Sequence, residues 1–233
     1  MRINKYFTDR GLCSRRQADK FIREGRIKIN GKVAILGDQI SENDNITLDD
    51  SPTAIENSKV YIMYNKPVGV TCTTELNVTR NIVAEIKHPK RIFPIGRLDK
   101  DSTGLIFLTN DGDIVNQILR AQFNHEKEYI VQVDRPMDAK FIIKMSSGVN
   151  IGDHMTMPCK VKAVNPKSFS IILTEGKNRQ IRRMCETLGY QVRSLQRIRI
   201  MNVKLGSLAQ GHWQNIPQQE LDQIKNSIDK SLN

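Results

Sequence analysis

Four charged residues in one short turn are the first candidates for chemistry in this sequence. Residues 93–114, FPIGRLDKDSTGLIFLTNDGDI, enclose them between two apolar stretches: Arg97, Asp99, Lys100 and Asp101. A turn between strands needs Gly, Asn or Ser for its backbone, but it does not need an arginine two residues before an aspartate. Because connecting loops lie mostly on the surface, a solvated turn is the plain alternative interpretation.

Asp99 is of the right type to act as a covalent nucleophile. An ionised carboxylate can attack a sugar carbon, as in glycoside chemistry, when the site is shielded from water. Burial alone raises the pKa of a carboxyl group and neutralises it, whereas a nearby guanidinium favours the charged form. Arginine suits this task because it stays charged and holds a carboxylate in a fixed geometry. The segment EGKNRQIRRM, residues 175–184, could supply such an arginine from a distant part of the chain.

The chain is strongly basic, and its charge is concentrated in two blocks. It has 36 Lys and Arg residues against 25 Asp and Glu residues in a length of 233, a net charge of +11. Residues 1–32 contain ten basic and three acidic residues, and residues 176–204 contain eight basic residues against Glu186 alone. Residues 33–57 carry six acids and no Lys or Arg. This distribution indicates a polyanionic partner, most often nucleic acid, with an anionic membrane surface as the alternative.

Several kinds of site are disfavoured by the sequence. The four cysteines and four histidines lie far apart, which argues against a disulfide framework and a zinc site, so we expect no metal. The segment GRLDKDSTG lacks the spacing of a phosphate-binding loop. No apolar run approaches the roughly 20 residues of a membrane span, and MRINKYFTDRG has no apolar core of the signal-peptide kind. We therefore expect a cytoplasmic protein, and a monomer.

The first fifty residues are predicted to form a module of two short helices and a hairpin. The segment RINKYFTDRG is amphipathic and ends at Gly11, which is typical of a helix stop. A second helix follows in SRRQADKFIREG, where Ser14 and Gln17 have the spacing of a capping box. Its apolar residues would face inward and leave a basic outer face. The pair Asn30-Gly31 in RIKINGKVAI is the strongest short signal for a hairpin.

From residue 59 to residue 233 the pattern predicts a second, larger domain. Segments rich in β-branched and aromatic residues predict strands in VYIMYN, GLIFLTN, KEYIVQVD, PCKVKAV, FSIILT and VRSLQRIRIM. Helical spacing occurs in DIVNQILR, DAKFIIKMSSG and NRQIRRMCETLG. Because no regular βαβ rhythm is present, we expect an α+β domain with a mixed, mainly antiparallel sheet and packed helices. Residues 51–58, polar and containing Pro52, are predicted to be a linker after a first domain at 1–50.

The N-terminal residues resemble the S4 RNA-binding domain. The resemblance is carried by the motifs SRRxA at residues 14–18 and IxxGxIxING at residues 22–31. In S4 modules the basic helix face contacts RNA phosphates, which implies RNA-binding roles for Arg15, Arg16 and Lys28. Such contacts set affinity and salt dependence without reading sequence. A basic helical pair that binds nothing in particular is the alternative.

Three further segments, in order, resemble motifs I, II and III of the RNA pseudouridine synthases. They are GRLDKDSTGLIFLTNDG, KEYIV and EGKNRQIRRM. The S4 module points to the branch that acts on ribosomal RNA, and HEKEYIV, NRQIRRMCETLGY and RIRIMNVKL most resemble the large-subunit (23S) F type. The resemblance covers essentially the whole chain except its C-terminal end. It implies an enzyme that isomerises a uridine to pseudouridine by base flipping, without a cofactor.

The same resemblance implies roles for individual residues. Asp99 in motif I would be the nucleophile, and Tyr129 in motif II would pack on the base and assist proton removal at C5. Arg182 in motif III would pair with Asp99. Ile181 and Leu195 would form an apolar wall of the pocket.

Other charged residues have less definite roles in this resemblance. Arg97 would help to extract the uridine from the RNA stack. Arg179 and Arg183 flank the site arginine, and we interpret them as phosphate contacts or solvated helix charges. Lys66, in NKPVGV, matches a family motif as well, and a structural role in a turn is an equal alternative.

Three alternatives stay open at this stage. The chain could be a non-catalytic S4-type RNA-binding protein or ribosome-assembly factor. It could carry out the same chemistry on a small-subunit ribosomal RNA or on a tRNA. Attack could fall on ribose C1′ or on uracil C6.

Overall fold

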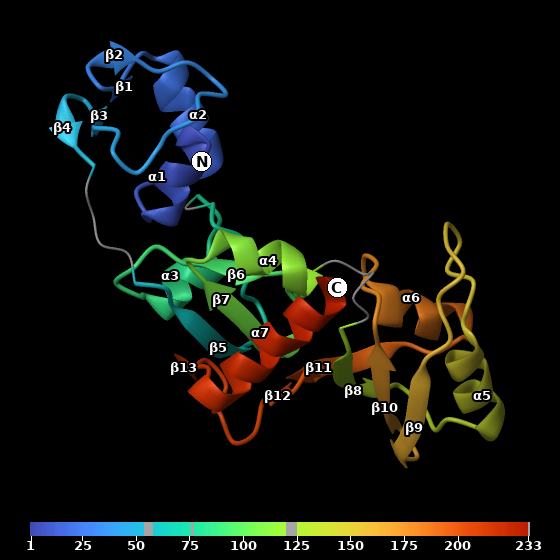
Figure 1. Ribbon diagram of the computed structural model, residues 1–233. Helices are drawn as coiled ribbons and strands as arrows, with labels where there is room; N and C mark the ends of the chain where they lie inside the picture. The colour runs from blue at the N-terminus through green and yellow to red at the C-terminus, as the bar shows by residue number, and fades with distance from the viewer. Residues whose placement is uncertain (54–57, 76, 120–124, 233) are drawn as a thin grey trace. The chain divides into compact units, whose positions relative to one another are not determined.

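The computed structural model describes residues 1–53, 58–75, 77–119 and 125–232 (Figure 1). Two compact units are present. One comprises residues 1–60 together with 88–92 and 109–112, and the other comprises the remaining chain. In the described residues no helix is both long enough and apolar enough to cross a bilayer.

The N-terminal unit contains two helices and a four-stranded sheet. The helices are α1 (Ile3–Asp9) and α2 (Arg15–Arg23). The strands are all antiparallel and follow the order β2-β1-β3-β4, with bounds β1 (Ile27–Ile29), β2 (Lys32–Val33), β3 (Ile46–Leu48) and β4 (Ser51–Pro52). The strand β4 begins at the first residue of the predicted linker, and residues 54–57 of that linker lie outside the described residues.

Local sequence signals account for this unit. Ser14 Oγ accepts a hydrogen bond of 3.1 Å from the backbone N–H of Gln17, so it caps α2 as its spacing predicts. Asn30 and Gly31 have φ angles of 49° and 82°, the two positive values that a tight two-residue hairpin requires. The helices and sheet bury a shared apolar core: Ile3, Phe7, Ala18, Ile22, Ile27, Ala34, Ile40 and Ile46.

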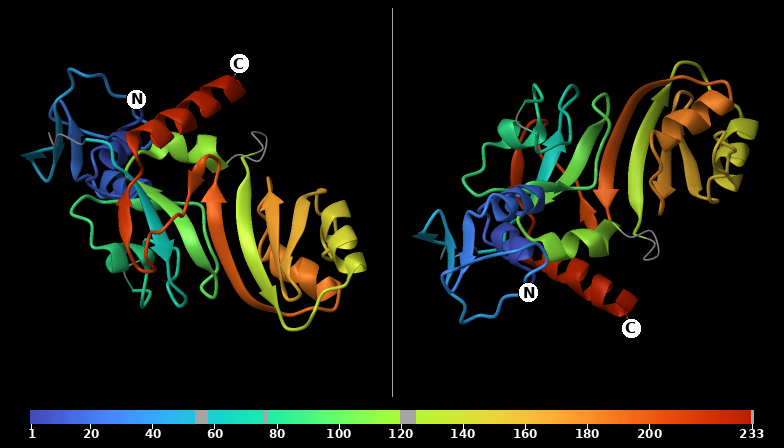
Figure 2. Two further views of the ribbon diagram at one scale, coloured as in Figure 1. Left: turned by 90° about the horizontal axis from the view of Figure 1, so that it is seen from below. Right: turned by 90° about the horizontal axis from the view of Figure 1, so that it is seen from above.

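The second unit is organised around a mixed sheet of nine strands (Figures 1 and 2). Its strands are β5 (Tyr61–Lys66), β6 (Phe93–Ile95), β7 (Thr103–Thr109), β8 (Lys127–Val133), β9 (Lys160–Asn165), β10 (Ser168–Leu173), β11 (Val192–Ile200), β12 (Val203–Lys204) and β13 (Trp213–Asn215). The main order is β13-β5-β7-β11-β8-β10-β9, with β12 beside β11 and β6 beside β7. The contact of β7 with β11 is parallel, and the pairs β11–β8, β8–β10 and β10–β9 are antiparallel. The expected α+β class and the six predicted strands are confirmed.

Helices cover this sheet at both of its ends. They are α3 (Ile82–Ile86), α4 (Gly112–Leu119), α5 (Ala139–Ser147), α6 (Gln180–Thr187) and α7 (Gln218–Leu232). α4 and α7 bury apolar side chains against β5 and β7 in one cluster, which includes Met63, Leu105, Phe107, Ile114, Ile118, Leu221, Ile224 and Ile228. α5 packs beside β9 and β10, where the Phe141 and Phe169 rings meet edge to face with centroids 5.4 Å apart. Figure 2 shows α5 and α6 at the opposite end of the sheet from α4 and α7.

One glycine allows the parallel contact that holds the sheet together at its centre. Gly104, at the start of β7, has a φ of +103°, and a Cβ built there would lie 2.2 Å from the carbonyl oxygen of Arg197 and 2.7 Å from its nitrogen. Any side chain would therefore push β7 away from β11. Because only Thr103 separates Gly104 from the turn of residues 99–102, the close approach brings the charged turn beside β11, some ninety residues later in the chain.

Candidate active site

The charged turn is fixed by backbone hydrogen bonds on both sides. Ser102 N–H donates to the carbonyl of Asp99 at 3.0 Å, which closes residues 99–102 into a turn. Gly69 N–H donates to the carbonyl of Lys100 at 2.8 Å, and the N–H of Leu98 points at the sulfur of Cys72 at 3.4 Å. The turn that carries Asp99 is therefore held by the segment that follows β5.

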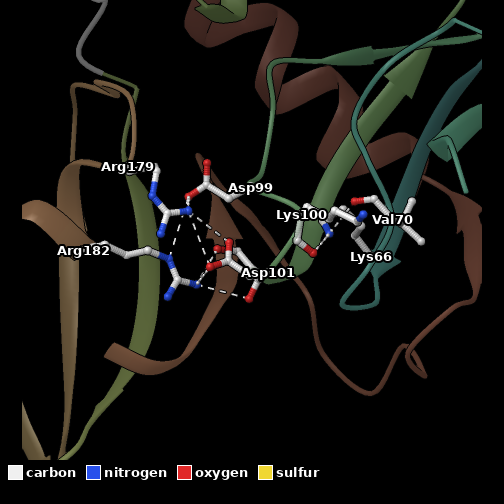
Figure 3. A network of polar contacts seen from close by, with 8 residues as sticks. Lys66, Val70, Asp99, Lys100, Asp101, Arg179 and Arg182 are labelled. Carbon is white, nitrogen blue, oxygen red and sulfur yellow. Dashed lines mark hydrogen bonds and ion pairs between the residues drawn. The ribbon is translucent and has the colours of Figure 1, made fainter. Parts of the chain in front are cut away.

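Lys66, the last residue of β5, contacts the turn on the side away from Arg179 and Arg182 (Figure 3). Its ammonium donates to the carbonyls of Pro67 and Val70 at 2.9 Å and to that of Lys100 at 3.4 Å. The side chain is fully buried, and this burial lowers the pKa of Lys66 from its ordinary value. The contacts agree with the structural alternative considered for this residue, because the ammonium joins two loops.

The helix α6 presents one arginine of the second basic block, Arg182, to this turn. Its buried face contains Gln180, Ile181, Arg182, Met184 and Cys185, and the glycine after it, Gly189, has a φ of +81° as a helix stop requires. Arg182 is only 7% exposed although it is charged. A buried guanidinium needs acceptors close by.

The acceptors for Arg182 lie in the turn (Figure 3). Its Nη2 donates to the carbonyl of Asp101 and to Ser102 Oγ, both at 3.1 Å, and lies 3.3 Å from Asp101 Oδ2. Its Nε lies 3.9 Å from Asp99 Oδ2 and is buried without a hydrogen-bond partner in the described residues. Arg182 and Asp99 are thus neighbours, but Asp101 makes the shorter ion pair, and sequence reasoning assigned Asp101 no role.

The two arginines that flank Arg182 in the sequence, Arg179 and Arg183, also have partners within the protein. Arg179 Nη1 lies 3.3 Å from Asp101 Oδ1 and 3.9 Å from Asp99 Oδ2, so it belongs to the same cluster of charges. Arg183 pairs with Asp153 and with the carbonyl of Ile151. Both were interpreted from sequence as phosphate contacts or solvated charges, and each would have to share its charge with a carboxylate to contact RNA.

A cavity of about 570 Å³ opens beside the carboxylate of Asp99. Its lining includes all six residues that the sequence assigned to catalysis and substrate binding: Arg97, Asp99, Tyr129, Ile181, Arg182 and Leu195. Tyr129, Ile181 and Leu195 are each less than 10% exposed and form apolar and aromatic surface, while the Asp99 side chain is 30% exposed. Volume and lining suit a planar ring next to the carboxylate of Asp99.

Glu175 is a site residue that sequence reasoning missed. It is buried, and its carboxylate accepts hydrogen bonds from the N–H of Met157 at 2.9 Å and from Gln180 Nε2 at 2.6 Å, and lies 3.1 Å from His154 Nε2. Burial by itself would raise the pKa of Glu175, but these hydrogen bonds outweigh it and lower the pKa overall. Glu175 thus ties the segment 149–157 to the start of α6 along one wall of the cavity.

The basic residues of the N-terminal unit differ in how they are engaged. Arg15 and Arg16 are exposed on α2, and neither forms a hydrogen bond or ion pair in the described residues. Lys28 instead lies 2.6 Å from Asp50 Oδ1. Asp50 follows Asp49, and both adopt positive φ in a hairpin between β3 and β4 that the sequence analysis did not predict.

Comparison with known proteins gives concordant matches over both units. Residues 60–187 match the family described as RNA pseudouridylate synthase, and residues 1–46 match the S4 domain. The chain is 50% identical to the dual-specificity RNA pseudouridine synthase RluF of Escherichia coli K12, over 99% of this chain and 80% of the relative. It is 32% identical to the ribosomal large subunit pseudouridine synthase B of Bacillus subtilis, over 100% and 98% of the two chains. A crystal structure of a pseudouridylate synthase aligns with a TM-score of 0.71 at 30% identity, covering 96% of this chain and 99% of that one.

Proposed function

The chain belongs to the RNA pseudouridine synthases, and from this premise we propose that it isomerises a uridine of 23S ribosomal RNA with Asp99 as the nucleophile. The observation that carries the assignment of Asp99 is its position at the wall of the cavity, with Arg182 and Arg179 beside it. The ribosomal substrate is supported by the similarity to the Bacillus subtilis enzyme, which is named a ribosomal large subunit pseudouridine synthase.

The proposed reaction conserves every atom of the nucleotide. The carboxylate of Asp99 attacks the nucleotide at ribose C1′ or at uracil C6, and the bond between N1 and C1′ breaks. The detached uracil turns, C5 bonds to C1′, and the bond to Asp99 breaks again. The proton on C5 is lost and N1 gains a proton, so the net change is an isomerisation that consumes no cofactor.

The residues around the cavity have complementary roles in this proposal. The guanidiniums of Arg182 and Arg179 attract the Asp99 carboxylate from one side and fix its position for attack. Tyr129 packs on the uracil and assists removal of the C5 proton. Ile181 and Leu195 exclude water from the ring while it is detached.

The target uridine must also leave the RNA stack before it can enter the cavity. Taking a uridine out of the stack costs a few kcal/mol, which protein contacts must offset. Arg97 is exposed and lines the cavity, so we propose that it helps to extract the uridine or fills the space that it leaves. Arg15 and Arg16 in the domain at residues 1–50 supply phosphate contacts that are independent of sequence.

The substitution Asp99→Asn tests the proposal. We expect it to abolish pseudouridine formation in 23S transcripts and to leave RNA affinity within about threefold, because phosphate contacts dominate affinity. Asp153→Asn is the matched control: Asp153 pairs with Arg183 and is absent from the lining of the cavity. Pseudouridine formation by Asp99→Asn would reject the mechanism. Failure of the wild type on ribosomal RNA and tRNA would favour a non-catalytic RNA-binding protein.

A further inference from the structure

The cavity contains a second buried guanidinium, which the proposed mechanism does not use. Arg197, on β11, lines the cavity and is only 4% exposed. Its Nε donates to the carbonyl of Leu105 at 2.6 Å, and neither Nη nitrogen forms a hydrogen bond in the described residues. Nη2 is a fully buried donor without a partner. Buried donors of a charged group cost stability when they are left unpaired, so a ligand that accepts from them would relieve this cost.

Strand register places Arg197 next to the aromatic surface proposed to hold the base. Arg197 lies directly opposite Tyr129 in the antiparallel pair of β11 and β8. Opposite residues in such a pair have Cβ atoms about 5 Å apart and side chains on the same face. Leu195, two residues earlier on β11, lies on that face too and also lines the cavity. A ring that packs on Tyr129 and Leu195 would therefore lie within reach of the guanidinium.

A second cation reinforces the positive charge at this end of the cavity. Lys127 lies on β8, two residues before Tyr129, and lines the same cavity. Burial, and after it the charge of Arg197, lowers the pKa of Lys127, whose ammonium donates to the carbonyl of His125 at 3.2 Å. The two acids that line the cavity, Asp99 and Glu175, are already occupied by other partners. The Arg197 end is therefore suited to an acceptor on the ligand.

We propose that Arg197 donates from its Nη groups to a carbonyl oxygen of the target uracil, with Lys127 as a second cation in the lining of the same cavity. This inference rests on the proposed function. Rotation of a uracil ring about the axis through N3 and C6 exchanges N1 with C5 and at the same time O2 with O4. A fixed donor therefore meets O2 in the substrate orientation and O4 in the product orientation, or the reverse. Arg197 holds the ring before and after the turn without moving itself.

The same donor stabilises the ring when it becomes negative. Cleavage of the bond to C1′ leaves electrons on N1 that delocalise onto O2 and O4, and addition at C6 places charge on O4. A preorganised guanidinium at a carbonyl oxygen strengthens its hydrogen bond as this charge develops. Cytosine carries an amino donor in place of O4, so one of its two orientations would set donor against donor. Arg197 is thus both a catalytic residue and a determinant of uracil specificity.

The experiment uses transcripts with uridine, 2-thiouridine or 4-thiouridine at the target position, since sulfur accepts hydrogen bonds weakly. Single-turnover rates are measured for the wild type and for Arg197→Met, which has no donor. We expect Arg197→Met to slow uridine conversion by about 100-fold, as loss of one oxyanion donor does. The ratio of thio to uridine rates should differ between wild type and variant by about tenfold or more for both thio substrates.

A matched arginine on the same strand serves as the control. Arg199 pairs with Glu126 and Glu128 and is absent from the cavity lining, so Arg199→Met should keep the wild-type ratios. Arg197→Lys keeps a cation and is the second variant in case Arg197→Met does not fold; its ratios should be intermediate. Wild-type ratios in both Arg197 variants would overturn the inference and leave the proposed function intact. A wild type that forms no pseudouridine would overturn the proposed function itself.

Discussion

The turn at residues 99–102 and the helix α2 differ in whether their arginines form ion pairs within the protein. At the turn, the guanidiniums of Arg179 and Arg182 are matched by the carboxylates of Asp99 and Asp101. On α2, Arg15 and Arg16 have no partner in the described residues. Matched charges cost little to keep in a fixed place, whereas unmatched surface charges are available to a polyanion. The difference agrees with the proposal that the turn positions a reactive group and that α2 contacts RNA.

The same contrast appears within the N-terminal unit. Arg26 pairs with Asp49, and Lys28 pairs with Asp50, while Arg15 and Arg16 of α2 have no ion-pair partner in the part of the chain that the structure describes. Lys28 was assigned to RNA binding together with Arg15 and Arg16, but it must release a carboxylate before it can contact a phosphate. We therefore expect its contribution to be smaller than that of either arginine.

The largest effect is expected at Arg182. Arg182→Met removes the guanidinium beside Asp99 and leaves Asp101 without its buried partner, so kcat should fall by about 10³. RNA affinity should stay within about threefold, because this substitution leaves the exposed arginines Arg15 and Arg16 unchanged. Steady-state kinetics and filter binding measure the two quantities.

The neighbouring arginine provides the matched comparison for that variant. Arg183 lies on the same helix but pairs with Asp153 outside the cavity, so Arg183→Met should leave kcat within about threefold. Equal losses of kcat in both variants would show that activity depends on α6 as a whole and not on the ion pairs between Arg182 and the turn.

A smaller effect is expected from the free arginines of α2. The double variant Arg15→Ala/Arg16→Ala should weaken RNA binding by about tenfold and reduce the slope of log K against log salt by about 2. Lys28→Ala should change the slope by less than about 1, because Asp50 already neutralises the ammonium.

Removing the competing carboxylate sharpens this test. Asp50→Asn frees Lys28 and should strengthen RNA binding by a fewfold, measured over the same salt series. The opposite result is a salt slope that changes by the same amount for each charge removed, whether the charge is Lys28 or an arginine of α2. That result would show that an ion pair with Asp50 does not prevent a cation from binding RNA.

The smallest effect is expected at Glu175, the acid of the cavity wall whose carboxylate is hydrogen-bonded by Met157 and Gln180. Its pKa is lowered in the folded protein, so its stabilising effect is full above the ordinary carboxyl pKa and is lost as the pH falls through the lowered value. Glu175→Gln should reduce the free energy of unfolding by about 1–2 kcal/mol at pH 7. Urea denaturation between pH 7 and pH 3 should show this difference shrinking on the acid side. A constant difference would mean that the carboxylate charge has no part in bracing residues 149–157.

Sequence patterns predicted the elements of the fold better than the contacts between them. Strands such as β7 are recognisable because consecutive β-branched and aromatic residues are typical of a sheet covered on both faces. The helix α7 was missed although Leu221, Ile224 and Ile228 have helical spacing and are all buried.

The candidate site shows where local patterns are insufficient. Asp99, Tyr129 and Arg182 were found through ordered motifs, but Asp101 and Arg197 depend on the parallel contact between β7 and β11. That contact joins residues about ninety positions apart and is possible only because Gly104 has no side chain. A pattern read within a short window carries no information on such a contact.

The enclosed ammonium of Lys66 has a consequence for chemical modification. A lysine whose pKa is lowered is a good nucleophile, but this one is out of reach of acylating reagents while its three carbonyl partners surround it. Acylation can occur only when the segment after β5 opens locally. The rate at which Lys66 is acylated would therefore report how often the segment that supports the turn of Asp99 opens.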